Sequence, residues 1–188
     1  MRSLSWKAGL AGAALALSLG TSSAQSPQPY AGLQARAIKA LSEQQIADLK
    51  AGRGMELALA GELNGYPGPL HVLEHANALG LSEAQRAKMQ ELFAAMKAEA
   101  VPLGEQLIAQ EARLDRQFAD KTITAAGLTA ALQEIGGTQS ALRAAHLRYH
   151  LLAAELLTPA QLRLYAELRG YAGGNHERPQ HGEHPRPK

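Results

Sequence analysis

The 188-residue chain contains no cysteine. This absence excludes cysteine nucleophiles, CxxC redox pairs and thiolate ligands for a metal. It also excludes disulfides, so a hydrophobic core or a partner chain must stabilise the fold. Aromatic residues make up only 4% of the chain and β-branched residues are scarce, whereas Ala, Leu, Gln, Glu and Arg dominate. This composition favours helix throughout, and we predict an all-α fold.

The chain also lacks a strong excess of charge of one sign. It has 19 Lys+Arg against 17 Asp+Glu, and its sequence pI is about 9.0. Arg2 and Lys7 belong to an N-terminal segment that we expect to be removed, which leaves 17 basic and 17 acidic residues. Nucleic-acid binding requires a strongly basic face, so we expect no nucleic-acid partner.

The first 24 residues have the pattern of a secretory signal peptide. Arg2 and Lys7 give a positive start, residues 8–19 form a short apolar run, and small residues at 21–24 suit a signal peptidase. We predict export with cleavage near Ala24, so that the mature chain begins near Gln25. The alternative is an uncleaved anchor, although the run is short for a bilayer span of roughly 20 residues.

Caps and turn residues divide the mature chain into helices. The expected helices span residues 43–51, 55–63, 70–79, 83–118, 125–156 and 159–169. Ser42, Ser82, Thr124 and Thr158 stand where a hydroxyl can cap the first turn of a helix. Two of these helices are long and should form an antiparallel pair.

The first long helix has an apolar stripe with an eleven-residue repeat, which is typical of a nearly straight helix. The stripe consists of Leu92, Met96, Leu103, Leu107, Leu114 and Phe118. Pro102 and Gly104 interrupt the helix near its middle and should bend it.

One phrase occurs twice at predicted helix starts. It reads Leu81-Ser82-Glu83-Ala84-Gln85 in the first copy and Leu157-Thr158-Pro159-Ala160-Gln161 in the second, and residues 41–45 form a looser third copy. In each, the hydroxyl can accept hydrogen bonds from the first helical turn, and the glutamine can reach back to the cap. The leucine ahead of the cap should pack inward.

The two copies resemble the LTxxQ motifs of the Spy/CpxP superfamily, over roughly residues 68–171. The resemblance implies a periplasmic protein whose four helices form a hooked hairpin, usually as a homodimer. The superfamily includes chaperones, stress-sensor accessory proteins, zinc-resistance proteins and heavy-metal sensors. The expected parts are therefore a signal peptide (1–24), an N-terminal helical extension (25–67), a Spy/CpxP-like domain (68–171) and a disordered His-rich tail (172–188).

The histidines outside the tail form two pairs with helical spacing. His71 and His75 are four residues apart, with Glu74 beside them, and His146 and His150 are also four apart. Histidines at i and i+4 can share one metal ion. Because each pair precedes a copy of the motif by a similar distance, the four imidazoles and the carboxylate could converge on Zn, Ni, Co or Cu. The alternative is that they are ordinary core or surface histidines. His176, His181 and His184 in the tail could bind metal weakly, and the alternative is a solubilising tail without a specific role.

The heavy-metal-sensor branch of the superfamily looks similar at these positions. It carries a His-x-x-x-His before the first motif, which His71 and His75 match, and a histidine on the helix before the second motif. His146 or His150 matches that histidine approximately. The branch also takes a glutamate from the first long helix, where this chain has Phe93 and, as the nearby carboxylates, Glu74 and Glu91.

These patterns predict a stress-response protein that binds or senses a divalent transition metal through histidines between helices. The alternative is an ATP-independent chaperone or envelope-stress adaptor, which would hold clients on an apolar face containing Met89, Met96 and Leu103 unless these residues form the core or a dimer interface. A purely structural interaction module is the third possibility. Expected partners are a second copy, unfolded envelope proteins or a membrane-bound regulator.

No catalytic arrangement is recognisable, and we expect neither enzyme activity nor an organic cofactor. A Ser–His–Asp arrangement, a phosphate loop and paired catalytic carboxylates are all missing. Residues 71–75 read HVLEH, which matches the signature of an inverted zinc protease. That chemistry requires a third ligand from a much larger domain and a substrate cleft.

Overall fold

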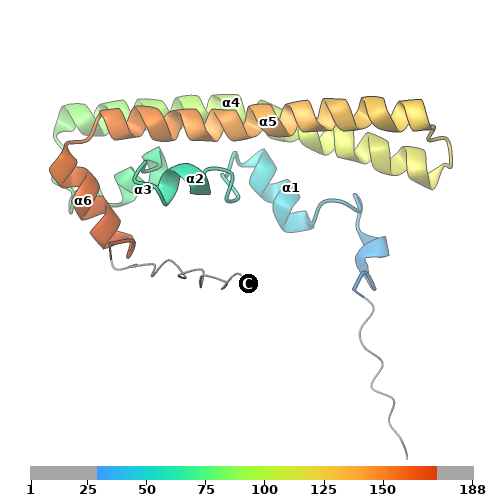
Figure 1. Ribbon diagram of the computed structural model, residues 1–188, viewed down its shortest axis with the longest axis horizontal. Helices are drawn as coiled ribbons and strands as arrows, with labels where there is room; N and C mark the ends of the chain where they lie inside the picture. The colour runs from blue at the N-terminus through green and yellow to red at the C-terminus, as the bar shows by residue number, and fades with distance from the viewer. Residues whose placement is uncertain (1–28, 173–188) are drawn as a thin grey trace, which may run out of the picture. The chain divides into compact units, whose positions relative to one another are not determined.

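The computed structural model describes residues 29–172 (Figure 1). The predicted signal peptide and the tail histidines lie outside these residues. The chain divides after Ala31, and every helix found in residues 29–172 belongs to the unit that begins at Gly32. Within residues 29–172 there is no strand, only one isolated bridge between Ile38 and Leu41, so the predicted all-α class is confirmed.

The two long helices pack along each other. The helices are α1 (Glu43–Lys50), α2 (Leu59–Glu62), α3 (Pro69–Glu74), α4 (Glu83–Ala119), α5 (Ala125–Glu155) and α6 (Pro159–Leu168), preceded by a short 3-10 helix, Leu33–Ala35. A turn of five residues joins α4 to α5, which makes the pair antiparallel, and α1 and α3 pack against α4 (Figure 1). In the part of the chain that the structure describes, no helix combines the length and hydrophobicity needed to cross a bilayer.

Complete capping boxes begin three of the helices. The hydroxyls of Ser42, Ser82 and Thr158 accept hydrogen bonds from the backbone N–H groups of the glutamines three residues later, at 3.1, 3.2 and 3.2 Å. Each glutamine Oε1 in turn accepts from the backbone N–H of the cap residue. Thr124 caps α5 through its hydroxyl alone, which accepts from the Gly127 N–H. Local sequence therefore determines where these four helices begin.

The two short helices after α1 differ from their predictions. The prediction of a helix over 55–63 is wrong in its first half, because α2 begins only at Leu59. Met55 and Glu56 have left-handed backbone angles instead, with φ of 39° and 66°. Met55 instead packs against a hydrophobic cluster formed with α1, α4 and α5, so tertiary packing overrides its helix propensity. The helix expected over 70–79 ends at Glu74 and continues as turns to Gly80, whose φ is 59°.

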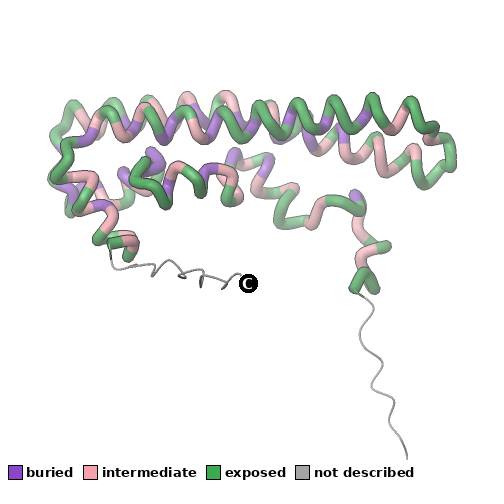
Figure 2. The backbone as a smooth tube through the Cα atoms, viewed as in Figure 1, coloured by how far each residue is buried: buried purple, intermediate pink, exposed green. Residues whose placement is uncertain are grey.

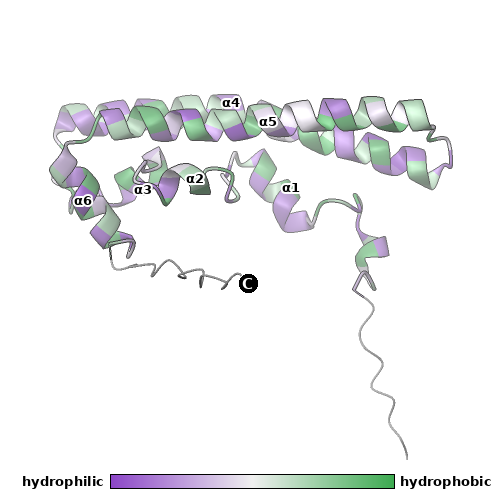
Figure 3. Cartoon of the chain, in the orientation of Figure 1, coloured by the Kyte–Doolittle hydropathy of each residue, from purple (hydrophilic) through white to green (hydrophobic). Residues whose placement is uncertain are grey.

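Two clusters of buried hydrophobic residues lie along the long helices, whose exposed surface carries polar residues and some apolar ones (Figures 2 and 3). One lies where α3 and α6 meet the long helices and contains Val72, Ala76, Leu79, Leu81, Met89, Ala153, Leu157 and Tyr165. The other lies under α1 and contains Leu49, Ala100, Leu107, Ile135 and Leu142. Met89 and Met96 are buried, so they belong to the core, which was the alternative to a client-binding face, whereas Leu103 is only partly buried. Phe118, the last residue of the predicted stripe, is exposed instead of buried.

α1 crosses α4 at Gly104. A Cβ on this residue would stand 2.5 Å from the backbone oxygen of Leu49. This distance is too short for any side chain, so a larger residue here would force α1 and α4 apart. Gly104, which was predicted to interrupt the long helix, lies within the single helix α4 and is a position where the backbone of α1 comes very close. This contact and the packing of α2 on α5 place residues 43–62 against the two long helices.

Candidate metal site

His146 and His150 lie one turn apart on α5 and are both buried, with 2% and 8% of their surface exposed. Glycines leave the space that the two rings occupy. A Cβ on Gly54 would contact the His146 ring at 3.6 Å, and a Cβ on Gly68 would stand only 2.9 Å from Nε2 of His150. The predicted i, i+4 pair therefore faces the segment between α1 and α3.

A backbone carbonyl fixes the tautomer of His150. Its Nδ1 lies 2.7 Å from the oxygen of Tyr66. A carbonyl only accepts hydrogen bonds, so Nδ1 must carry the proton and Nε2 keeps its lone pair when the ring is neutral. The free nitrogen of His150 is the one beside Gly68.

His146 has a buried nitrogen without a partner. Its Nε2 forms no hydrogen bond to any of residues 29–172. Burial lowers the pKa of His146 below its ordinary value, and the neighbouring charge of His150 lowers it further. The ring is therefore neutral near pH 7. A buried imidazole nitrogen left unsatisfied is energetically costly, so this atom is suited to receive a ligand.

His71 on α3 lines the same cavity as the two α5 histidines. Its Nδ1 lies 2.9 Å from a carboxylate oxygen of Glu74. The cavity has a volume of about 400 Å³. It is lined by Ala51, Gly52, Arg53, Gly54, Gly68, Pro69, Leu70, His71, Phe93, Met96, Lys97, His146 and His150. Three of the four histidines predicted as ligands thus border one space.

The other predicted ligands lie elsewhere. His75 packs edge-on against the ring of Tyr165, with centroids 6.4 Å apart, and does not line the cavity. Glu74 is exposed, and its carboxylate lies against His71 and does not line the cavity. Over residues 29–172, no three His, Asp or Glu side chains are arranged to hold a metal ion. The histidines border a common cavity without converging on one point.

A buried carboxylate that the sequence analysis missed stands next to His150. Glu62, 6% exposed, lies with its Oε2 3.7 Å from Nδ1 of His150. It accepts hydrogen bonds from the hydroxyls of Tyr165 (2.5 Å) and Tyr171 (3.1 Å) and from the backbone N–H of Gly68 (3.1 Å). Burial and the bond to Glu62 raise the pKa of the Tyr165 phenol, so that hydroxyl remains a donor.

The Glu62 carboxylate is also paired with Arg169, whose Nε lies 3.4 Å away. Its oxygens are therefore occupied by protein donors, and its role is to support the segment that carries Tyr66 and Gly68. No local pattern marks Glu62, because the two tyrosines that bind it follow 103 and 109 residues later.

The two copies of the repeated motif are directly bonded to each other. Nε2 of Gln85 donates to Oε1 of Gln161 at 2.9 Å and to the backbone oxygen of Leu156 at 2.8 Å. Nε2 of Gln161 donates back to Oε1 of Gln85 at 3.2 Å. The leucines ahead of both caps, Leu81 and Leu157, are buried in one cluster. The motifs therefore form one joint that holds the starts of α4 and α6 together.

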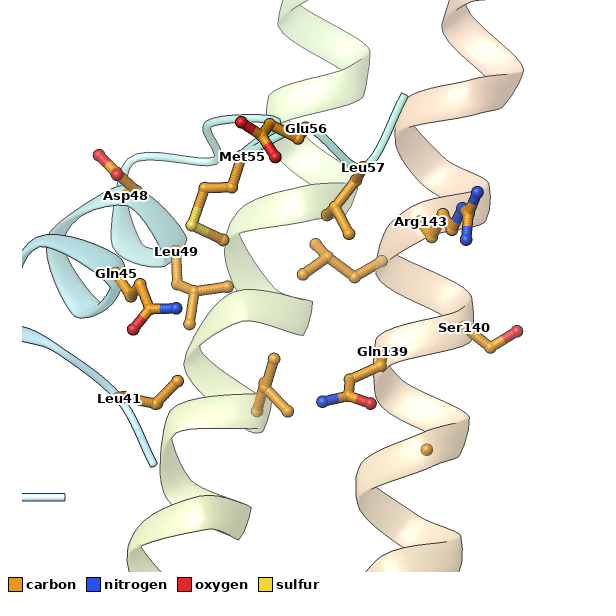
Figure 4. Close-up of a pocket in the computed structure, with 13 residues that line it drawn as sticks. Leu41, Gln45, Asp48, Leu49, Met55, Glu56, Leu57, Gln139, Ser140 and Arg143 are labelled. Carbon is orange, nitrogen blue, oxygen red and sulfur yellow. The ribbon is translucent and has the colours of Figure 1, made fainter. Parts of the chain in front are cut away.

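A larger and more open groove lies between α1, α4 and α5 (Figure 4). Its volume is about 780 Å³. The apolar residues that line it are Leu41, Leu49, Met55, Leu57, Leu107 and Leu142. Asp48, Glu56 and Arg143 are its charged residues. None of the predicted site residues borders this groove.

Comparison of the chain with protein-family models, curated proteins and solved structures found no significant match.

Proposed function

We propose that this chain is an exported stress-response protein of Spy/CpxP type that binds a divalent transition metal through His146 and His150, with His71 across the same cavity. The observation that carries the proposal is Nε2 of His146, which is buried, neutral near pH 7 and without a hydrogen-bond partner among residues 29–172. The repeated motif supports the family assignment, and with it the hooked hairpin, the periplasmic location and the homodimer.

The donor set suits borderline metals. Neutral imidazole nitrogens bind Zn, Ni, Co and Cu, and no thiolate is present to select softer ions. His150 offers Nε2 because its Nδ1 is bonded to Tyr66. A metal bound here would lie between α5 and the loop before α3, so its binding would stiffen the junction between these elements. Such a change is one that a membrane-bound regulator could detect.

Calorimetric titration tests the proposal. The mature chain from Gln25, with the three tail histidines replaced by Asn to remove flexible ligands, would be titrated separately with Zn²⁺, Ni²⁺, Co²⁺ and Cu²⁺. We expect saturable binding of one ion per chain, lost in the His146→Ala, His150→Ala double variant.

The matched control for this titration is His75→Ala. His75 belongs to the predicted ligand set but packs against Tyr165 outside the cavity. Its replacement should leave the affinity within about threefold of the parent, since it removes no ligand. Equal affinity in the double variant and the parent would refute the proposal.

The groove under α1 favours a second candidate function, the holding of unfolded clients. Its leucine and methionine floor offers an apolar surface between the long helices (Figure 4). Suppression of client aggregation with EDTA present, reduced by Leu57→Asp at the groove wall, would support this function. Unchanged suppression in that variant would exclude the groove as the client site.

A further inference from the structure

The charged side chains that line the histidine cavity are all basic. They are Arg53 and Lys97, and no aspartate or glutamate lines the cavity. Arg53 pairs with Asp48 at 2.5 Å. The ammonium of Lys97 lies over the Phe93 ring, 5.9 Å from its centroid, and forms no ion pair with residues 29–172. A metal cation bound by neutral imidazoles would therefore meet the positive charge of Lys97 and no carboxylate in the cavity wall.

Glu62 does not supply the missing negative charge. It is the carboxylate nearest to the ring of His150, but its oxygens accept from Tyr165, Tyr171 and Gly68 and are paired with Arg169. It belongs to a second cavity of about 230 Å³, which shares Gly54, His71 and His150 with the first. Glu56 and Arg169 also line this second cavity, whereas the charged residues that line the histidine cavity are Arg53 and Lys97 alone.

The cavity is also much larger than a metal ion needs. Its volume is about 400 Å³, whereas a water molecule takes about 30 Å³ of liquid volume, so an ion with a few waters fills only part of the space. Cavities of about 300–1,000 Å³ are typical of organic ligands. Part of the wall is apolar: Pro69, Leu70, Phe93 and Met96. The space suits a small organic molecule beside the ion.

We propose that the cavity takes up its metal together with a small organic carboxylate, which Lys97 holds with support from Arg53. This inference rests on the proposed metal-binding function and names the form in which the metal is recognised. The carboxylate supplies the negative charge that the protein lacks there, and its oxygens occupy metal positions that the described histidines leave open. Lys97, whose ammonium forms no ion pair with residues 29–172, and His146, whose Nε2 is buried without a hydrogen-bond partner among them, line the same cavity and suit the two parts of such a complex.

Equilibrium dialysis with radiolabelled citrate tests this inference. The mature chain with tail histidines replaced by Asn would be dialysed against citrate with equimolar Ni²⁺, against citrate alone, and against Ni²⁺ in a buffer of weakly coordinating anions. We expect one citrate retained per chain only when Ni²⁺ is present, because each component compensates the charge of the other. Phosphate in place of citrate should be retained at least about tenfold less, since it is too small to contact the apolar wall.

Lys97→Gln is the decisive variant and Lys88→Gln its matched control. Lys88 is also an exposed lysine of α4, but it pairs with Glu91 and lies outside the cavity. Lys97→Gln should weaken citrate retention about tenfold, the loss expected for one charge-assisted contact, while Ni²⁺ binding without citrate does not weaken. Lys88→Gln should change neither quantity.

The outcomes separate the two proposals. Binding of Ni²⁺ without retention of citrate, equal retention of phosphate, or equal effects of the two lysine variants would overturn the carboxylate inference and leave the metal function standing. Failure of Ni²⁺ to bind under either condition would overturn the metal function and the inference with it.

Discussion

The side-chain amides of Gln85 and Gln161 are hydrogen-bonded to each other in both directions, at 2.9 and 3.2 Å, across the starts of α4 and α6. Each glutamine also completes the capping box of its own helix. The repeated motif is thus two local caps and one long-range contact, formed by the same two side chains.

This contact predicts energetic coupling between the two copies. Gln85→Met and Gln161→Met should each destabilise the protein, and a double-mutant cycle should give a coupling of about 1 kcal/mol, as expected for one to two net hydrogen bonds. Urea denaturation measures all three variants. Gln45→Met is the control, because Gln45 completes a capping box without a long-range amide partner, so its effect should add to that of Gln85→Met. Additive effects of the Gln85 and Gln161 substitutions would contradict the coupling.

The crossing of α1 over α4 predicts opposite effects for two glycine substitutions. Gly104→Ala places a Cβ against the Leu49 backbone and should destabilise the protein by about 1–3 kcal/mol, the range for overpacking. Gly137→Ala on α5 has open space around its Cβ and should stabilise by up to about 1 kcal/mol through helix propensity. Thermal and urea unfolding measure both. A Gly104→Ala protein as stable as the parent would show that α1 does not pack as described.

The metal site predicts a specific effect of covering Nε2 of His150. Gly68 has φ −77°, so alanine is compatible with its backbone, but the added Cβ would stand 2.9 Å from that nitrogen. Gly68→Ala should therefore weaken metal binding about tenfold or more while the helical content stays unchanged. In the control, Gly61→Ala, the Cβ meets only ordinary contacts at 3.5–3.6 Å, so affinity should not change. Titration calorimetry compares the two, and equal affinities would remove His150 from the site.

The buried histidine predicts a loss of stability in acid. The pKa of His146 is lowered in the folded chain by burial and by His150, so the unfolded chain binds its proton first as the pH falls. The contribution of neutral His146 to the stability of the folded chain is therefore fully present above the ordinary histidine pKa of about 6.5. This contribution declines as the pH falls below that value. The other ionisable side chains that border this cavity are His71, His150, Arg53 and Lys97.

Urea midpoints between pH 7.5 and 5 measure this effect. His146→Leu removes the titrating group and should give a shallower fall than the parent over this range. His75→Leu serves as the control, since His75 is only half-buried and lies away from the cavity. Identical pH profiles for His146→Leu and the parent would show that His146 is not the residue responsible.

Those features that depend on neighbouring residues could be predicted from the sequence. The caps at Ser42, Ser82, Thr124 and Thr158 bond to residues three positions away, and all four helices begin where the hydroxyls indicate. Met55 shows the limit of such reasoning. Its local sequence favours helix, but packing under α1 holds it in a left-handed turn.

The site was only partly predictable, because helical spacing shows which side chains share a face but not what that face meets. His146 and His150 share a face and a cavity, as the spacing indicates. His71 and His75 separate, the first toward that cavity and the second toward Tyr165. Neither Glu62 beside His150 nor the bond between Gln85 and Gln161 has a local signal, since their partners are more than 70 residues away.

The claim that His146 binds metal through Nε2 is tested most directly by ¹⁵N NMR of the imidazoles during a Zn²⁺ titration of histidine-labelled protein. Resonances would be assigned with the single-histidine variants. Metal binding by both rings predicts that the resonances of Nε2 of His146 and Nε2 of His150 shift together and saturate at one ion per chain, while those of the His75 nitrogens do not shift. An unchanged Nε2 resonance of His146 at saturating Zn²⁺ would contradict it.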